Sequence, residues 1–292
     1  MLDYLQDLKG PIMNGLLLGG LYGIIGIGMS MIFGIVRLVN LAHGDLVILA
    51  SYLSLVVMGF FKVDPLLSLV IVIPVMFLIG FILQFNLINR VVGKGMNAPL
   101  LVAFGLSIIL QNLLLLLFTP DARTLLTSIA VKSLPVGGFL NVPLVYLVDF
   151  IGAILTILIL AQFFKKTYLG KAIRAASDDE GAAQLMGINT KVIYSWAMAI
   201  AMGTAAIAGV FVGMTFTFYP HTGPEYLIIA FGVVIIGGLG SLFGTFLGGL
   251  ILGLAQILGA HFLGPGFQLL SGYIILLIVL ALKPTGLFAK GQ

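Results

Sequence analysis

The sequence predicts an all-α membrane protein with about eight or nine transmembrane helices, organised as one transmembrane domain over residues 1–292. Of the 292 residues, 61% are hydrophobic and 8% are charged, whereas a soluble domain carries about a quarter charged residues. Nine apolar runs approach or reach the length needed to cross about 30 Å of hydrocarbon, two of them being short. They are Ile12–Val36, Leu46–Phe61, Leu66–Asn89, Leu100–Phe118, Leu144–Phe164, Ile193–Phe218, Leu227–Leu239, Phe243–Phe262 and Phe267–Leu282.

Composition also argues against several functional classes. The formal net charge is +4, but the basic residues lie mostly at the ends of apolar runs, a pattern typical of membrane orientation and not of nucleic-acid binding. The chain has no cysteine, and its three histidines show no metal-ligand spacing. Because it also lacks the phosphate-loop, H-E-x-x-H and G-x-S-x-G motifs, we expect no catalytic residues, no metal and no cofactor bound by this chain.

One long polar interval, Lys165–Lys191, interrupts the apolar sequence and should lie in water. Ser177 and Glu180 have capping-box spacing, and Asp178 and Asp179 between them suit the positive end of a helix dipole. A short helix is therefore expected to begin there.

The same helix should end at Gly187, where a left-handed residue allows Ile188 to fold back on Ala183. The helix would have about nine residues, too few to hold together alone in water. We therefore expect Ala183 and Met186 to face a groove on a cytoplasmic partner.

The basic residues predict an orientation. With the interval 165–191 in the cytoplasm and the spans alternating, ten of the 14 basic residues fall on the cytoplasmic side and four on the other. This bias indicates an external N-terminus and a cytoplasmic C-terminus.

Glycines recur at four-residue spacing in the first span and again late in the chain, which allows helix backbones to approach closely in a bilayer. They are Gly15, Gly19 and Gly23, then Gly240, Gly244 and Gly248, and Gly249 and Gly253.

The two ends of the chain show a weak internal similarity. N-L-A-H-G-D at 40–45 matches the position of F-Y-P-H-T-G at 218–223, each after a glycine-containing span and before a short one. Possible inverted-repeat halves are 11–118 and 193–283.

Polar residues within the spans are candidates for a substrate path. Asn40, His43 and Asp45 surround Gly44 and indicate a broken helix, which either lines a cavity inside the membrane or forms a turn at the cytoplasmic rim. Further candidates are Asn14, Tyr22, Gln111 and Asn112, although each alone is more often a contact between helices than a ligand contact.

Four stretches taken in order carry a family resemblance. They are Asn14–Gly28 followed by N-L-A-H-G-D, G-K-A-I-R-A-A-S-D-D-E-G-A-A-Q-L-M-G-I-N at 170–189, Gly237–Gly253, and K-P-T-G-L-F at 283–288. Together they resemble the permease subunits of bacterial branched-chain amino acid ABC importers. The loop at 89–99, N-R-V-V-G-K-G-M-N-A-P, departs from the acidic residue and R-P pair of many relatives.

The resemblance implies an inner-membrane importer with two permease subunits, two cytoplasmic ATPases that bind ATP, and an external substrate-binding protein. Segment 170–189 corresponds to the ATPase-docking segment, and its expected coupling residues are Gly170, Arg174, Asp178, Glu180, Ala182, Ala183, Met186 and Gly187. The substrate would be a small amino acid, with a branched chain expected first. The alternatives are a gradient-driven channel or facilitator for urea or an amide, and a structural scaffold; a channel has no need of the capped cytoplasmic helix.

Overall fold

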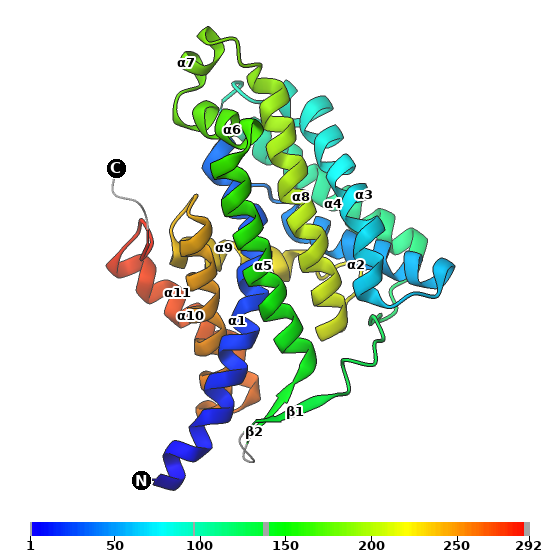
Figure 1. The fold of residues 1–292 in the computed structure, drawn as a ribbon, viewed down its shortest axis with the longest axis vertical. Helices are drawn as coiled ribbons and strands as arrows, with labels where there is room; N and C mark the ends of the chain where they lie inside the picture. The colour runs from blue at the N-terminus through cyan, green and yellow to red at the C-terminus, as the bar shows by residue number, and fades with distance from the viewer. Residues whose placement is uncertain (1, 96, 137–139, 289–292) are drawn as a thin grey trace.

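The computed structural model describes residues 2–95, 97–136 and 140–288 and confirms the all-α membrane fold (Figure 1). Within these residues, eight helices are long and apolar enough to cross a membrane, and one apolar helix is shorter. The elements are α1 (Leu2–Val36), α2 (His43–Phe61), α3 (Pro65–Asn86), η1 (Ile88–Arg90), α4 (Asn97–Phe118), β1 (Ser133–Val136), β2 (Leu140–Pro143), α5 (Leu144–Lys166), α6 (Tyr168–Asp178), α7 (Glu180–Leu185), α8 (Thr190–Thr215), α9 (Gly223–Gly237), α10 (Leu242–Leu263), η2 (Pro265–Phe267) and α11 (Gln268–Leu282).

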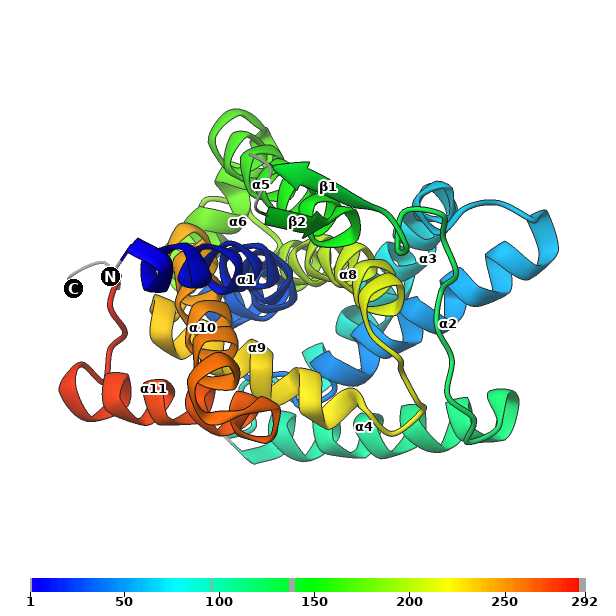
Figure 2. The ribbon, with the colours of Figure 1, turned by 90° about the horizontal axis from the view of Figure 1, so that it is seen from below.

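The glycine spacing of the first span and of the late span produces one close helix pair, α1 with α10 (Figure 2). A Cβ atom on Gly19 would lie 2.6 Å from Leu250 Cα, and one on Gly249 would lie 2.5 Å from Gly23 N. A Cβ on Gly253 would lie 2.5 Å from Gly15 O. Real Cβ atoms are not found this close to backbone, so the two helices approach to a distance that only glycine permits.

The chain reverses sharply after α1 and returns into the bundle. Arg37 adopts a left-handed conformation with φ of 56°, and the segment that follows brings the His43 Nε2 atom to 2.9 Å from the Ile25 carbonyl oxygen. Ile25 precedes Val36, the end of α1, by eleven residues, or about 16 Å along a helix. The break at 40–45 therefore lies inside the bundle and not at its rim.

A second return segment follows α8. Phe218 pairs with Arg123 through two backbone hydrogen bonds of 2.9 and 3.0 Å, and α9 then begins at Gly223, in contact with Gly44 at the start of α2. The turn after α9 touches Gly34 near the end of α1, whereas α2 leads to the opposite end of the molecule. The helices α2 and α9 thus start at one point and run in opposite directions. Opposite directions of these two helices are what an inverted repeat requires. The division into repeat halves 11–118 and 193–283 stays a prediction.

The polar interval 165–191 holds two helices, α6 and α7, where one was predicted, and they project at one end of the bundle (Figure 1). The predicted cap at Ser177 is wrong, because Ser177 lies within α6 and its hydroxyl donates to the Gly34 carbonyl oxygen at 2.6 Å. Asp179 caps α7 instead, accepting from the Ala182 amide at 2.9 Å. Consequently α7 has six residues, not about nine.

The predicted end of this helix is confirmed, but of the two side chains expected to face outward only Met186 is exposed. Gly187 has φ of 82°, and the Ile188 amide donates to the Ala183 carbonyl at 3.0 Å. Ala183 is only 4% exposed and belongs to the core of its own chain, so the expectation that it faces a partner is wrong. Leu185 and Met186 are exposed by 90% and 82%.

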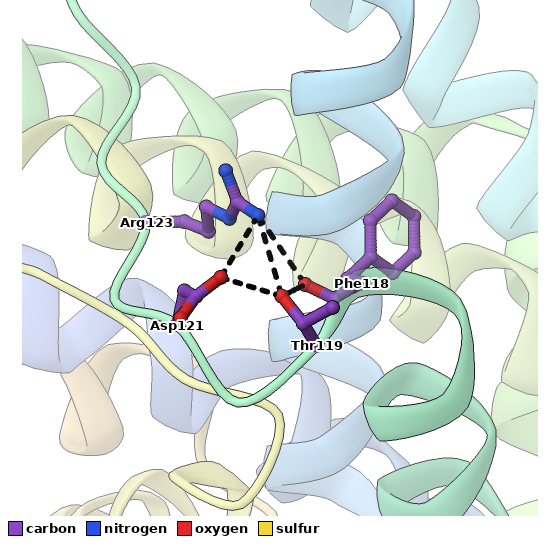
Figure 3. Close-up of polar contacts among 4 residues, drawn as sticks. All are labelled: Phe118, Thr119, Asp121 and Arg123. Carbon is purple, nitrogen blue, oxygen red and sulfur yellow. Dashed lines mark hydrogen bonds and ion pairs between the residues drawn. The ribbon is translucent and has the colours of Figure 1, made fainter.

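The opposite end of the bundle carries the connection from Thr119 to Pro143. It contains the antiparallel hairpin of β1 and β2, a small addition to the all-α prediction. Before the hairpin, the Arg123 guanidinium lies 3.6 Å from the Asp121 carboxylate and donates to the Phe118 carbonyl at 3.4 Å (Figure 3). These contacts and the backbone pairing with Phe218 fasten the connection to the end of α8.

Candidate functional site

The candidate site lies where the N-termini of α2 and α9 meet. A side chain on Gly44 would collide with the Gly223 carbonyl, and one on Gly223 would collide with the Asp45 carboxylate. Glycine at both positions therefore allows the two helix starts to touch. Each start presents the positive end of a helix dipole, an arrangement that favours negative charge nearby.

Asn40 and His43 hold the return segment in place. The Asn40 Oδ1 atom accepts from the Ala42 amide at 3.1 Å, and the Asn40 carbonyl accepts from the His43 amide at 3.0 Å. The His43 ring contacts the Ile25 carbonyl through Nε2, and because a carbonyl oxygen only accepts, Nε2 carries the proton. Both side chains are at most 5% exposed.

Asp45 extends the cluster to α4. Its Oδ2 atom accepts from the Ser107 hydroxyl at 2.5 Å, and Gln111 Nε2 donates to the Ser107 oxygen at 3.1 Å. Asp45 is 1% exposed and Ser107 is 7% exposed, whereas Gln111 is half-buried. The chain of hydrogen bonds thus runs from the centre of the bundle toward the outer face of α4.

Three polar atoms of this cluster are buried without a hydrogen-bond partner in the part of the chain that the structure describes: Asn40 Nδ2, His43 Nδ1 and Asp45 Oδ1. Buried polar groups are normally paired, because an unpaired one costs about 1–3 kcal/mol. An amide donor, a ring acceptor and a carboxylate oxygen together complement a small solute that carries both ammonium and carboxylate groups. Nothing in the described residues forms a metal-binding group of three or more His, Cys, Asp or Glu.

The other candidate path residues do not join this cluster. Tyr22 donates to Gln256 Oε1 at 2.7 Å and ties α1 to α10. Asn14 is half-buried, and Asn112 is exposed, with its Nδ2 donating to Ile108 O on its own helix at 2.8 Å. The cluster therefore contains Asn40, His43, Gly44, Asp45 and Gln111, but not Asn14, Tyr22 or Asn112.

The sequence prediction omitted one polar side chain that completes these contacts, Gln256. The available signal was a lone polar residue in an apolar helix. Asp149 forms a comparable buried pair elsewhere, accepting from the Thr215 hydroxyl at 2.6 Å while its Oδ1 has no partner among the described residues.

The expected coupling residues all lie at the α6–α7 end, in two different roles. Gly170 permits the tight turn between α5 and α6, since a Cβ there would lie 2.5 Å from the Phe163 carbonyl oxygen. Glu180 accepts from Thr190 at 3.2 Å and so holds α7 to the start of α8. The side chains on the surface of this end include Arg174, Asp178, Ala182, Leu185 and Met186.

Comparisons with known proteins agree over nearly the whole chain. The family model described as branched-chain amino acid transport system permease component matches residues 12–282. The chain is 31% identical to the high-affinity branched-chain amino acid transport system permease protein BraD of Pseudomonas aeruginosa, over 99% of this chain and 97% of that protein. It is 30% identical to LivH of Salmonella typhimurium over 96% and 94%, and 26% identical to a probable LivH of Methanocaldococcus jannaschii over 95% and 91%.

The hydrogen bond from Ser107 should stabilise the cluster measurably. Ser107→Ala leaves both Asp45 carboxylate oxygens buried without a described partner and should cost about 1–3 kcal/mol of folding free energy. The matched control is Ser30→Ala, because the Ser30 hydroxyl is buried and already has no partner among the described residues. Thermal unfolding of the purified protein in detergent should show a lower midpoint only for Ser107→Ala. Equal midpoints for the two variants would contradict this role.

Proposed function

Because the chain belongs to the family of permease components of branched-chain amino acid transport systems, we propose that it forms half of the membrane pathway of an ABC importer for branched-chain amino acids. The assembly would contain a second permease subunit, two cytoplasmic ATPases and an external substrate-binding protein. ATP would bind to the ATPases, and this chain would bind no cofactor.

The exposed apolar end of α7 is the observation that carries this proposal. Leu185 and Met186 are 90% and 82% exposed on an element that follows the last membrane-spanning turn of α5 and lies outside the spans. Exposed apolar side chains on a capped, projecting helix suit a protein partner, and methionine adapts readily to the shape of a groove. A gradient-driven channel would have no use for such a surface.

The proposed path for the substrate passes the cluster at Asn40, His43 and Asp45. Its support is the pairing of two interrupted helices deep in the bundle, the arrangement by which many transporters bind substrates near the bilayer midplane. An amino acid carries one ammonium and one carboxylate group, so Asp45 would meet the ammonium and the two helix starts would favour the carboxylate. The cluster is closed to solvent in this conformation, so transport would require α2 and α9 to separate.

The proposed orientation has the α6–α7 end in the cytoplasm, with the N-terminus outside and the C-terminus inside. Of the basic residues assigned to the cytoplasm, Lys165 and Lys166 end α5, Lys171 and Arg174 lie in α6, and Arg90, Lys94 and Lys191 line one cavity beside the start of α8. Lys290 lies outside the described residues. The positive-inside rule supports this choice, as does the need for an ATPase to reach α7.

The first experiment tests the partner surface. Leu185→Lys and Met186→Lys put a positive charge into the proposed contact. A positive charge at the C-terminus of a helix interacts favourably with the helix dipole, so α7 itself should stay folded. We expect both variants to reach the membrane normally, to lose the co-purifying ATPase and to lose uptake of labelled leucine. The control is Leu126→Lys, because Leu126 is similarly exposed (83%) and lies at the opposite end of the molecule. This variant should keep both the co-purifying ATPase and the uptake of leucine. Retention of ATPase and uptake by the α7 variants would refute the coupling role.

The second experiment tests the path with two buried aspartates. Asp45→Asn keeps the shape and the bond from Ser107 but removes the charge, so leucine uptake should fall at least tenfold while membrane abundance and ATPase retention hold. Asp149→Asn makes the same change in a buried aspartate that is bonded to Thr215, away from the cluster, and should preserve uptake. Equal uptake by the two variants would show that the cluster contributes to packing and not to the substrate path. Competition by valine and isoleucine, but not by urea, would support the substrate class.

The third experiment tests orientation and exploits the absence of cysteine. A membrane-impermeant maleimide should label Thr127→Cys in cells with a permeable outer barrier and label Asn189→Cys only after the inner membrane is opened. The reverse labelling pattern would invert the proposed topology.

A further inference from the structure

A basic cavity opens at the α6–α7 end of the bundle, between the end of α3 and the start of α8. Its volume is about 570 Å³, and its lining residues are Phe85, Asn86, Asn89, Arg90, Lys94 and Lys191. Sites for small molecules commonly have volumes of about 300–1,000 Å³. The cavity is therefore large enough for more than a single small ion.

The cavity carries positive charge without a counter-charge. Arg90, Lys94 and Lys191 line it, and no carboxylate does. The ion pair found in the described part of the chain is Arg123 with Asp121, at the opposite end. Glu180 lies near the start of α8 but accepts hydrogen bonds from Thr190 and Gln184 at 3.2 Å. Three unneutralised cations around one cavity favour an anionic ligand.

A set of hydrogen bonds from Asn89 holds the two walls of the cavity together. Asn89 Nδ2 donates to the Lys191 carbonyl at 3.0 Å and to Ser195 Oγ at 3.3 Å, which joins η1 to α8. Asn89 Oδ1 accepts from Gln84 Nε2 at 3.0 Å, and Gln84 is 1% exposed. The backbone that carries Arg90 and Lys191 is thus fixed before any ligand arrives, which lowers the cost of binding.

The position of the cavity identifies the class of ligand. It lies where the candidate span Pro65–Arg90 ends and the span Thr190–Thr215 begins, and the ends of membrane spans meet the headgroup region of a bilayer. Phe85, which is 48% exposed, adds an apolar wall beside the cations. A ligand that fits must therefore carry a negative headgroup and an apolar chain on adjacent sides.

We propose that this cavity holds the phosphate headgroup of an anionic phospholipid, with Arg90, Lys94 and Lys191 around the phosphate and Phe85 against the start of an acyl chain. The lipid would bridge the loop after α3 to α8, because its headgroup contacts both. This inference does not depend on the transported substrate.

The test compares lipids on the purified chain and on two triple variants. Phosphatidylglycerol should be retained in native mass spectrometry and should raise the thermal midpoint, whereas phosphatidylcholine should do neither. Arg90→Gln, Lys94→Gln and Lys191→Gln together should weaken phosphatidylglycerol binding by roughly 100-fold, since each basic residue near the surface contributes about 1 kcal/mol. The matched control is Lys165→Gln, Lys166→Gln and Lys171→Gln, three exposed cations at the same end that do not line the cavity, and it should bind the lipid normally.

Several outcomes would overturn the proposal. An equal loss in both triple variants would indicate general attraction to the surface, and displacement of the lipid by millimolar inorganic phosphate would indicate a site for the free ion. Unchanged lipid binding with loss of the co-purifying ATPase would assign the cavity to an acidic segment of that partner. If the triple variant is not monodisperse, Lys191→Gln alone serves, because Lys191 uses only its backbone carbonyl in the described contacts, and it should weaken binding about fivefold.

Discussion

The close approach of α1 and α10 is the contact on which the rest of the bundle depends. Lipid tails are as apolar as the helices, so association in a bilayer relies on packing and polar contacts. Glycines at 15, 19 and 23 face glycines at 249 and 253, and the backbones meet along more than two turns. The polar bond from Tyr22 to Gln256 secures the same pair. The return segments and the short helix α9 are arranged beside this pair.

Packing inside the bundle also explains how a break in the helical structure is tolerated inside the membrane. Residues 38–42 leave α1 with their backbone groups unpaired by a helix, a costly state in hydrocarbon. The segment finds partners close by: the Asn40 side chain accepts from the Ala42 amide, and the Asn40 carbonyl accepts from the His43 amide. Irregular backbone therefore lies where protein surrounds it, next to the second helix start at Gly223.

Local patterns predicted the spans, the glycine spacing and the existence of a break at 40–45, since each depends on a few neighbouring residues. The depth of the break was beyond the sequence, because it depends on the reversal at Arg37 and on contact with Ile25, far back along α1. Gln256 was missed for a similar reason, because its partner Tyr22 lies on a helix distant in the chain. Ser177 and Asp179 were both possible N-caps of α7. The Ser177 hydroxyl bonds to the Gly34 carbonyl, and Asp179 caps the helix. Ala183 was assigned to the wrong face because a helix of six residues shows too few turns to define one.

The bond from Ser177 to Gly34 also has a mechanical meaning. Gly34 touches Gly240, in the turn that joins α9 to α10, so one point connects α6, the end of α1 and the far end of α9. If docking of an ATPase on α7 drives transport as proposed, a displacement of α7 would pass along α6 to this contact and on to α9, whose other end touches Gly44. The backbones of α1 and α10 touch, so this pair would move as a unit. A small displacement at the α6–α7 end would thereby reach the buried polar cluster through a single helix.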